Sequence, residues 1–242
     1  MKLSCTVSAS LIFFISLPRY SFAQQFPDST LYNESVSRVH EVYLGEIEDN
    51  AAIYHGEEYI RNGLKANGFP FFESDQKLTG WISYMGITYF DRGLYYDMVS
   101  DEVVIPNYAG NALIALATEK TDSFSISGHV FVSLRATELN HLAKDGYYEE
   151  LYAGEPGVFV RREKKLVTGT GSDESKYVQY NRFLVRYKGV YYVVDSKKSL
   201  LEIFKDREDS LKKYFRANKL NFKRNFESAL VSSVTYYSQI KN

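Results

Sequence analysis

The side chains that could support nucleophilic, acid–base or metal chemistry are few, and their spacing matches no catalytic motif. The four histidines are His40, His55, His129 and His141. None forms a His-x-His or His-Glu-x-x-His pair, through which one helix or strand presents two ligands to a metal. Ser127-Gly128-His129 places a serine near a histidine, but the Gly-x-Ser-x-Gly turn that exposes a serine nucleophile does not occur. The sequence therefore predicts no catalytic residue, no metal site and no cofactor.

Paired carboxylates are the remaining route to catalysis, because a glycosidase needs only two that the fold brings together. Asp97 and Asp101 flank an expected turn, and Asp91 lies shortly before them. Acidic residues at turns more often accept hydrogen bonds from backbone amides. A hydrolase with a dispersed carboxylate and histidine site is therefore the alternative function.

Aromatic residues in neighbouring expected strands are the most suggestive feature of the chain. It contains 21 Tyr and 16 Phe but only one Trp. If alternation along the strands exposes some of these rings on one sheet face, they could stack on a glycan or hold a peptide. The candidate ligand-binding residues are Trp81, Tyr89, Tyr96 and Asp97. The competing interpretation is that the rings form cross-strand pairs within the sheet.

The first 23 residues have the three regions of a secretory signal peptide. Lys2 supplies a positive charge, an apolar stretch follows, and Ser21-Phe22-Ala23 provides the small residues that precede cleavage. The apolar stretch is short for a membrane span, which needs roughly 20 residues. We therefore expect cleavage after Ala23, export to the periplasm or the cell surface, and no transmembrane segment in the mature chain.

Cleavage changes both the charge and the cysteine content. The full chain has a formal charge of −1; losing Lys2 and Arg19 leaves 27 basic and 30 acidic residues, and so −3. This balance gives no general attraction for nucleic acid, which we do not expect as a partner. Cys5, the single cysteine, is removed as well. The mature chain would therefore fold without disulfides, and it would have no thiolate for catalysis.

The apolar patterns predict an α+β fold. A short N-terminal helix begins at Asp28 or Ser29 and ends near Ile47, and two C-terminal helices cover about 196–242. Between them, aromatic and β-branched runs predict a mainly antiparallel sheet, curled as a roll or half-barrel. We expect turns at Asp91-Arg92-Gly93 and Lys188-Gly189, an exposed loop over 168–175, and a single domain over 24–242. The expected strands are 80–86, 87–90, 94–99, 103–106, 112–117, 123–127, 129–134, 146–152, 158–162, 177–187 and 190–195.

Two segments resemble a known group of proteins. One is 80–105, with its Gly-x-x-x-Tyr-x-Gly opening and Leu94-Tyr95-Tyr96-Asp97; the other is the tail over 196–220, which starts Ser-Lys-Lys-Ser-Leu-Leu. Both are similar to uncharacterised exported proteins of Bacteroidota. The resemblance implies an envelope or secreted location and carries no activity.

Two functions follow from these patterns. The first is a non-enzymatic envelope protein that binds or scaffolds a partner, which could be an envelope protein, a glycan or a peptide. It predicts an exposed apolar patch. The second, the hydrolase, predicts a concave pocket where at least two titratable groups converge.

Overall fold

The computed structural model describes residues 52–61, 66–169 and 174–241. The chain divides into two units, Met1–Val42 and Tyr43–Asn242, and every described residue belongs to the second. The expected signal peptide and the N-terminal helix near 28–47 lie outside the described residues, as does the middle of the loop over 168–175.

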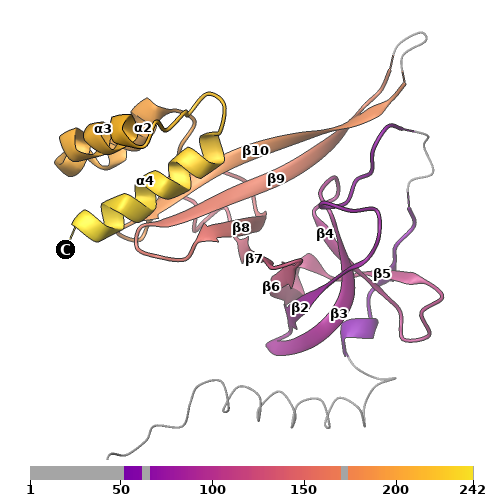
Figure 1. Cartoon of the computed structure of the whole chain (residues 1–242). Coiled ribbons are helices and arrows are strands. Elements are labelled where there is room, and N and C mark those ends of the chain that lie inside the picture. Colours follow the sequence, from indigo (N-terminus) through magenta and orange to yellow (C-terminus); the bar gives the residue numbers. More distant parts are fainter. Residues whose placement is uncertain (1–51, 62–65, 170–173, 242) are drawn as a thin grey trace, which may run out of the picture. The chain divides into compact units, whose positions relative to one another are not determined.

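The described part is built on one antiparallel sheet of eleven strands (Figure 1). Its order is β1-β5-β4-β3-β2-β6-β7-β8-β9-β10-β11, so β1 and β11 are the two edges and the sheet is not closed within the described residues. The mainly antiparallel, β-rich prediction is confirmed. The strands are β1 (Glu57–Glu58), β2 (Leu78–Tyr84), β3 (Ile87–Asp97), β4 (Glu102–Pro106), β5 (Leu113–Ala115), β6 (Thr121–Ile126), β7 (His129–Leu134), β8 (Gly146–Tyr152), β9 (Gly157–Val167), β10 (Lys176–Tyr187) and β11 (Val190–Val193).

Three hairpins of this sheet share one turn chemistry. Each is closed by a residue followed by glycine, both with positive φ: Met85-Gly86 (53° and 75°), Ser127-Gly128 (52° and 85°) and Lys188-Gly189 (52° and 74°). Two consecutive positive φ angles define the type I′ turn, whose twist matches that of the strands it joins. The hairpin expected at Lys188-Gly189 is therefore present, and it pairs Tyr187 with Val190.

The prediction of a turn at Asp91-Arg92-Gly93 is wrong, because β3 continues through these residues without a break. Gly80 pairs with Arg92 and Ile82 pairs with Tyr89, so β3 advances by one more residue than β2 between these two pairs. Asp91 lies in this interval with φ of 51°. An extra residue in one strand is a β-bulge, which bends the strand and uses the same residue types as a turn.

Aromatic rings fill the core between the strands of the first half of the sheet. Phe124 and Phe131 stack in parallel with their ring centroids 4.8 Å apart, and Tyr96 and Tyr147 both contact Phe124 edge-on. All four side chains are completely buried. Offset and edge-on aromatic pairs add stability beyond their buried area, so the high tyrosine and phenylalanine content serves this interior.

The C-terminal part forms three α-helices where two were expected. They are α2 (Lys197–Ile203), α3 (Glu208–Ala217) and α4 (Phe226–Ile240), with the short 3-10 turn η4 (Lys205–Arg207) between α2 and α3; two further 3-10 turns, η2 (Ala52–Tyr54) and η3 (Thr118–Lys120), lie near the sheet. The first expected helix breaks at Phe204, whose backbone leaves helical geometry at φ −106° and ψ 41°. This break lets the buried Phe204 ring stack on Tyr237 of α4 at 4.0 Å.

Local side-chain hydrogen bonds determine where α2 and α4 begin. Ser196 caps α2: its side chain accepts from the amide of Ser199, whose hydroxyl in turn accepts from the amide of Ser196. This is a reciprocal capping box. The last helix starts only at Phe226, because the side chain of Asn221 accepts from the amides of Lys223 and Arg224 and holds the preceding chain in a turn.

Candidate functional site

The aromatic residues predicted to bind a ligand lie mostly inside the sheet. Tyr89 is 2% exposed and Tyr96 is completely buried. The hydroxyl of Tyr96 donates to Asp101 at 2.7 Å, so its polar tip has a partner within the protein. Trp81 in β2 is half-buried. The structure therefore does not gather these rings on one accessible face.

Asp97 closes a turn at the end of β3. One carboxylate oxygen accepts from the amides of Val99 and Ser100 at 2.7 and 3.3 Å, and the other accepts from the Tyr59 hydroxyl at 2.6 Å. Side-chain oxygens that bind the amides two and three residues later stabilise turns. Both carboxylate oxygens accept hydrogen bonds within the protein, and Asp97 is 5% exposed. Stabilisation of this turn therefore accounts for the carboxylate.

A partly buried ion network joins the sheet to α4. Arg162 of β9 donates from both terminal nitrogens to the two carboxylate oxygens of Glu227, each at 3.1 Å, and its Nε donates to Glu149 of β8. Glu149 also lies 2.5 Å from Nδ1 of His129, and Nε2 of His129 lies 3.3 Å from Glu73. Planar, two-point Arg–carboxylate contacts are strong and directional.

Among the described residues, this network is the one place where a histidine forms ion pairs with carboxylates, so it bears on the hydrolase alternative. Both ring nitrogens of His129 already face protein carboxylates, and Glu149 is 2% exposed. A general base must reach a proton on a substrate, and no ring nitrogen of His129 is left over for that purpose. The network therefore fits a structural role, in which it holds β8, β9 and α4 together.

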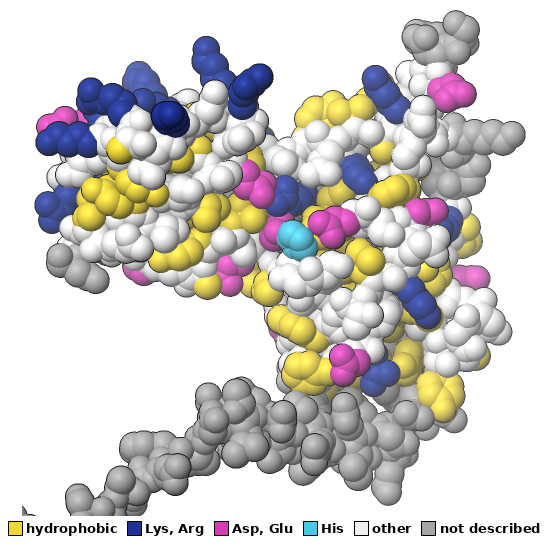
Figure 2. Space-filling model, in the orientation of Figure 1, with side chains coloured by type: hydrophobic (Ala, Val, Ile, Leu, Met, Phe, Trp, Pro, Cys, Tyr) yellow, Lys and Arg dark blue, Asp and Glu magenta, His cyan; other side chains and the backbone are white. Residues whose placement is uncertain are grey.

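The C-terminal helices carry most of the unbalanced positive charge of the protein. Residues 196–242 contain eleven Lys or Arg and five Asp or Glu. Figure 2 shows Lys and Arg side chains gathered over these helices. We call the following set the basic face: Lys197, Lys198, Lys205, Arg216, Lys219 and Lys223.

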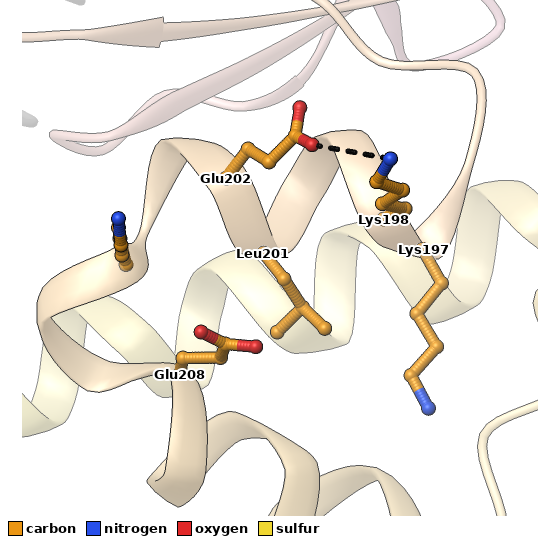
Figure 3. A pocket seen from close by; sticks show the side chains of 6 residues that line it. Lys197, Lys198, Leu201, Glu202 and Glu208 are labelled. Atoms are coloured by element: carbon orange, nitrogen blue, oxygen red, sulfur yellow. Dashed lines mark ion pairs between the residues drawn. The ribbon is translucent and has the colours of Figure 1, made fainter.

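Two grooves hollow the basic face. The first, about 650 Å³, is lined by Leu201 and by charged residues of α2, η4 and α3. In Figure 3 the Leu201 side chain lies between Lys197 and Glu208, and Lys198 forms an ion pair of 3.8 Å with Glu202. Glu208 forms its own ion pair with Lys212 at 2.6 Å, and this contact lowers the pKa of Glu208. The acids of this groove are therefore already paired with lysines.

The second groove, about 620 Å³, combines an apolar floor with a cationic rim. Phe215, Leu220 and Phe222 provide the apolar surface, and the Phe215 and Phe222 rings pack edge-on at 5.1 Å. Its rim contains Asp195 and four residues of the basic face: Lys197, Arg216, Lys219 and Lys223. Lys197 lines both grooves and lies 5.2 Å from the centre of the Phe215 ring.

Comparison with known proteins assigns no relative. A scan against protein-family models, a search of curated proteins and a search of solved structures each find no match to this chain. Over residues 52–61, 66–169 and 174–241, no three His, Asp or Glu side chains come together as a metal site would require. The described helices include none with the length and hydrophobicity needed to cross a membrane.

The basic face was missed at the level of sequence, although a signal existed. The excess of Lys and Arg after Ser196 is visible by counting. In the first groove, Leu201 comes from α2 and Glu208 from α3, and α2 ends at Phe204 between them. That break has no local sequence signature.

Proposed function

We propose that this protein is an exported, non-enzymatic binding module of the cell envelope, and that its C-terminal helices bind an acidic, partly apolar segment of another envelope protein. The observation that carries the proposal is the pair of adjoining grooves, with apolar floors and a rim of lysine and arginine. Export rests on the signal-like features of residues 1–23 and on the resemblance to exported proteins.

The charge of the rim favours an anionic partner. The two acids of the first groove have lysine partners, whereas Lys205, Lys219 and Lys223 have no carboxylate within ion-pair distance among the described residues. Clustered cations repel one another and raise the local concentration of anions. A partner with carboxylates along its edge would relieve this repulsion.

The apolar floor favours a partner that also buries side chains. Phe222 and Leu220 are half-buried at the surface of the second groove, and Leu201 occupies the first. Burial of apolar surface contributes about 25 cal/mol per Å², while charges at the rim chiefly steer association. Acidic peptide segments with apolar residues on one side satisfy both requirements.

A protein segment fits better than an anionic membrane surface. Asp195, Glu202 and Glu208 are interspersed among the lysines. A uniformly negative surface would meet these three acids as well as the cations, whereas a peptide can place its own groups to avoid them. Membrane binding is the competing outcome of the test.

The test is a binding titration with defined probes. A fluorescently labelled peptide of alternating Glu-rich and Leu-rich positions is titrated with the protein at low and at physiological salt, alongside the same peptide with Gln in place of Glu. We expect saturable binding of the Glu peptide that weakens with salt, and much weaker binding of the Gln peptide.

A matched pair of variants locates the binding. Lys219→Gln with Lys223→Gln removes two rim charges, and we expect at least a severalfold loss of affinity for the Glu peptide, since each near-surface ion pair contributes up to about 1 kcal/mol. Lys213→Gln is the control, because Lys213 is exposed on α3 and lines neither groove. Equal loss in the control, absence of peptide binding, or preferential binding to phosphatidylglycerol vesicles would each overturn the proposal.

A further inference from the structure

A third concave site lies against the sheet itself, lined by β9, β10 and the segment between β7 and β8. It has a volume of about 460 Å³. β9 and β10 run side by side here as one long hairpin (Figure 1). Its lining includes Leu142 and Lys144 from that segment, Arg161, Glu163 and Lys165 from β9, and Arg182 from β10.

The register of the hairpin concentrates cations on one face. Arg161 and Lys165 are four residues apart on β9, so both point to the same side of the strand. Arg182 of β10 is the direct cross-strand partner of Arg161. Like charges directly opposite each other destabilise a sheet, and Lys144 adds a further positive charge to this pocket. Glu163 is the one carboxylate of the lining.

Glu163 does not neutralise the cluster, because it is already committed to Arg161. The Nε of Arg161 donates to Glu163 at 2.9 Å, and its Nη2 donates to Asp101 at 3.1 Å. Arg161, which is 8% exposed, is therefore paired within the protein. Lys144, Lys165 and Arg182 remain without a carboxylate within ion-pair distance in the part of the chain that the structure describes.

The wall of the pocket between β7 and β8 is held firmly in place. Leu139 is completely buried and Ala143 is 8% exposed. The carbonyl of Lys144 accepts from the Tyr148 hydroxyl at 2.7 Å and from Arg161 at 3.2 Å. A site whose backbone is fixed before binding loses less entropy when the ligand arrives.

Arg182 is both positioned and available. One of its terminal nitrogens donates to the carbonyl of Leu142 at 3.3 Å, which ties β10 to the pocket wall. A guanidinium has five N–H donors in a planar fork, so most of them are left for a ligand. Planar forks of this kind match the paired oxygens of phosphate and sulfate groups.

We propose that this pocket binds a small molecule that carries a phosphate or sulfate group, with Lys144, Lys165 and Arg182 as its cationic ligands. Its volume lies within the roughly 300–1,000 Å³ typical of small-molecule sites. The pocket shares no lining residue with the two grooves of the basic face. The proposal therefore stands independently of the proposed function.

The experiment is isothermal titration of the full protein with inorganic phosphate, sodium sulfate and glucose 6-phosphate, with glucose as the neutral control. We expect saturable binding of at least one of the three anions and none of glucose. Stronger binding of glucose 6-phosphate than of the two inorganic ions identifies a phosphorylated organic ligand, whereas equal binding identifies a site for the oxyanion alone.

Variants assign the binding to the pocket. Lys144→Gln and Arg182→Gln should each weaken binding about tenfold to hundredfold, because a hydrogen bond to a charged group contributes roughly 1.5–3 kcal/mol. Lys120→Gln removes the same charge from an exposed position in η3 and should leave binding unchanged. If Arg182→Gln does not fold, Lys144→Gln, which alters an exposed side chain, still decides the matter. Unaltered affinity in Lys144→Gln, or no anion binding at millimolar concentration, overturns the proposal.

Discussion

Buried tyrosines should make this protein unusually sensitive to alkaline pH. Tyr96 and Tyr147 are completely buried. Burial raises the pKa of Tyr147 from 10.0 to about 12, and burial together with the charge of Asp101 raises the pKa of Tyr96 well above 10.0. In the unfolded chain both hydroxyls ionise near pH 10. The folded state therefore retains protons that the unfolded state has lost.

The sign and the size of the effect follow from this difference. The stabilisation is fully present below pH 10 and is lost as the pH rises toward the folded-state pKa, because stability falls with pH wherever the folded state holds more protons. In that window, each buried tyrosine lowers the free energy of unfolding by about 1.4 kcal/mol per pH unit. Tyr96 and Tyr147 together remove about 3 kcal/mol by pH 11, a large part of the roughly 5–15 kcal/mol that stabilises a typical domain.

The assay compares urea unfolding near pH 8 and near pH 11, followed by circular dichroism. Tyr147→Phe cannot ionise, so its free energy of unfolding should fall by about 1.4 kcal/mol less than that of the unmodified protein over this interval. Tyr180→Phe is the control, since Tyr180 is 48% exposed. Stability lost through the ionisation of other groups is the same in all three proteins, so it cancels when the variants are compared. An equal fall in Tyr147→Phe and the unmodified protein would refute the reasoning.

Three further substitutions test the ion network and the packing of the sheet. Arg162→Met leaves Glu149 buried with only His129 beside it and should cost about 3 kcal/mol in urea unfolding; replacing Glu149 by Met as well should recover most of that loss, and a purely additive double variant would contradict the network. Gly80→Ala should cost about 3 kcal/mol, because the added Cβ would lie 1.7 Å from the Ser125 carbonyl oxygen. An unchanged melting temperature would show that β2 and β6 can separate there.

The sheet was largely predictable because its turns have local signatures. Lys188-Gly189 marks a hairpin from composition alone, and the structure pairs Tyr187 with Val190 across it. Asp91-Arg92-Gly93 failed for a physical reason: a bulge needs the same permissive residues as a turn, and only the pairing of Gly80 with Arg92 shows that the strand continues.

The candidate sites were much less predictable. Alternation indicates that Tyr95 and Tyr96 point to opposite faces of β3, but it does not say which face the core covers, and Tyr96 proved to be the buried one. The helix break between α2 and α3 lies at Phe204, which stacks on Tyr237, a residue 33 positions away in sequence. The pocket on the hairpin depends on the exact pairing of Arg161 with Arg182. Long-range contacts of this kind have no local pattern.

The strand order has a consequence for how the chain folds. From β6 to β11, each strand pairs with the next one in sequence, so every step closes only a short loop. Among the eleven described strands, only two pairings, β1 with β5 and β2 with β6, join strands that are not consecutive, and the second brings Ile82 next to Phe124. Loop closure costs more entropy as the loop lengthens, and local contacts accelerate folding. The β6–β11 meander should therefore form early by successive addition of hairpins, and the pairings of β2 with β6 and of β1 with β5, which close longer loops, should form after it.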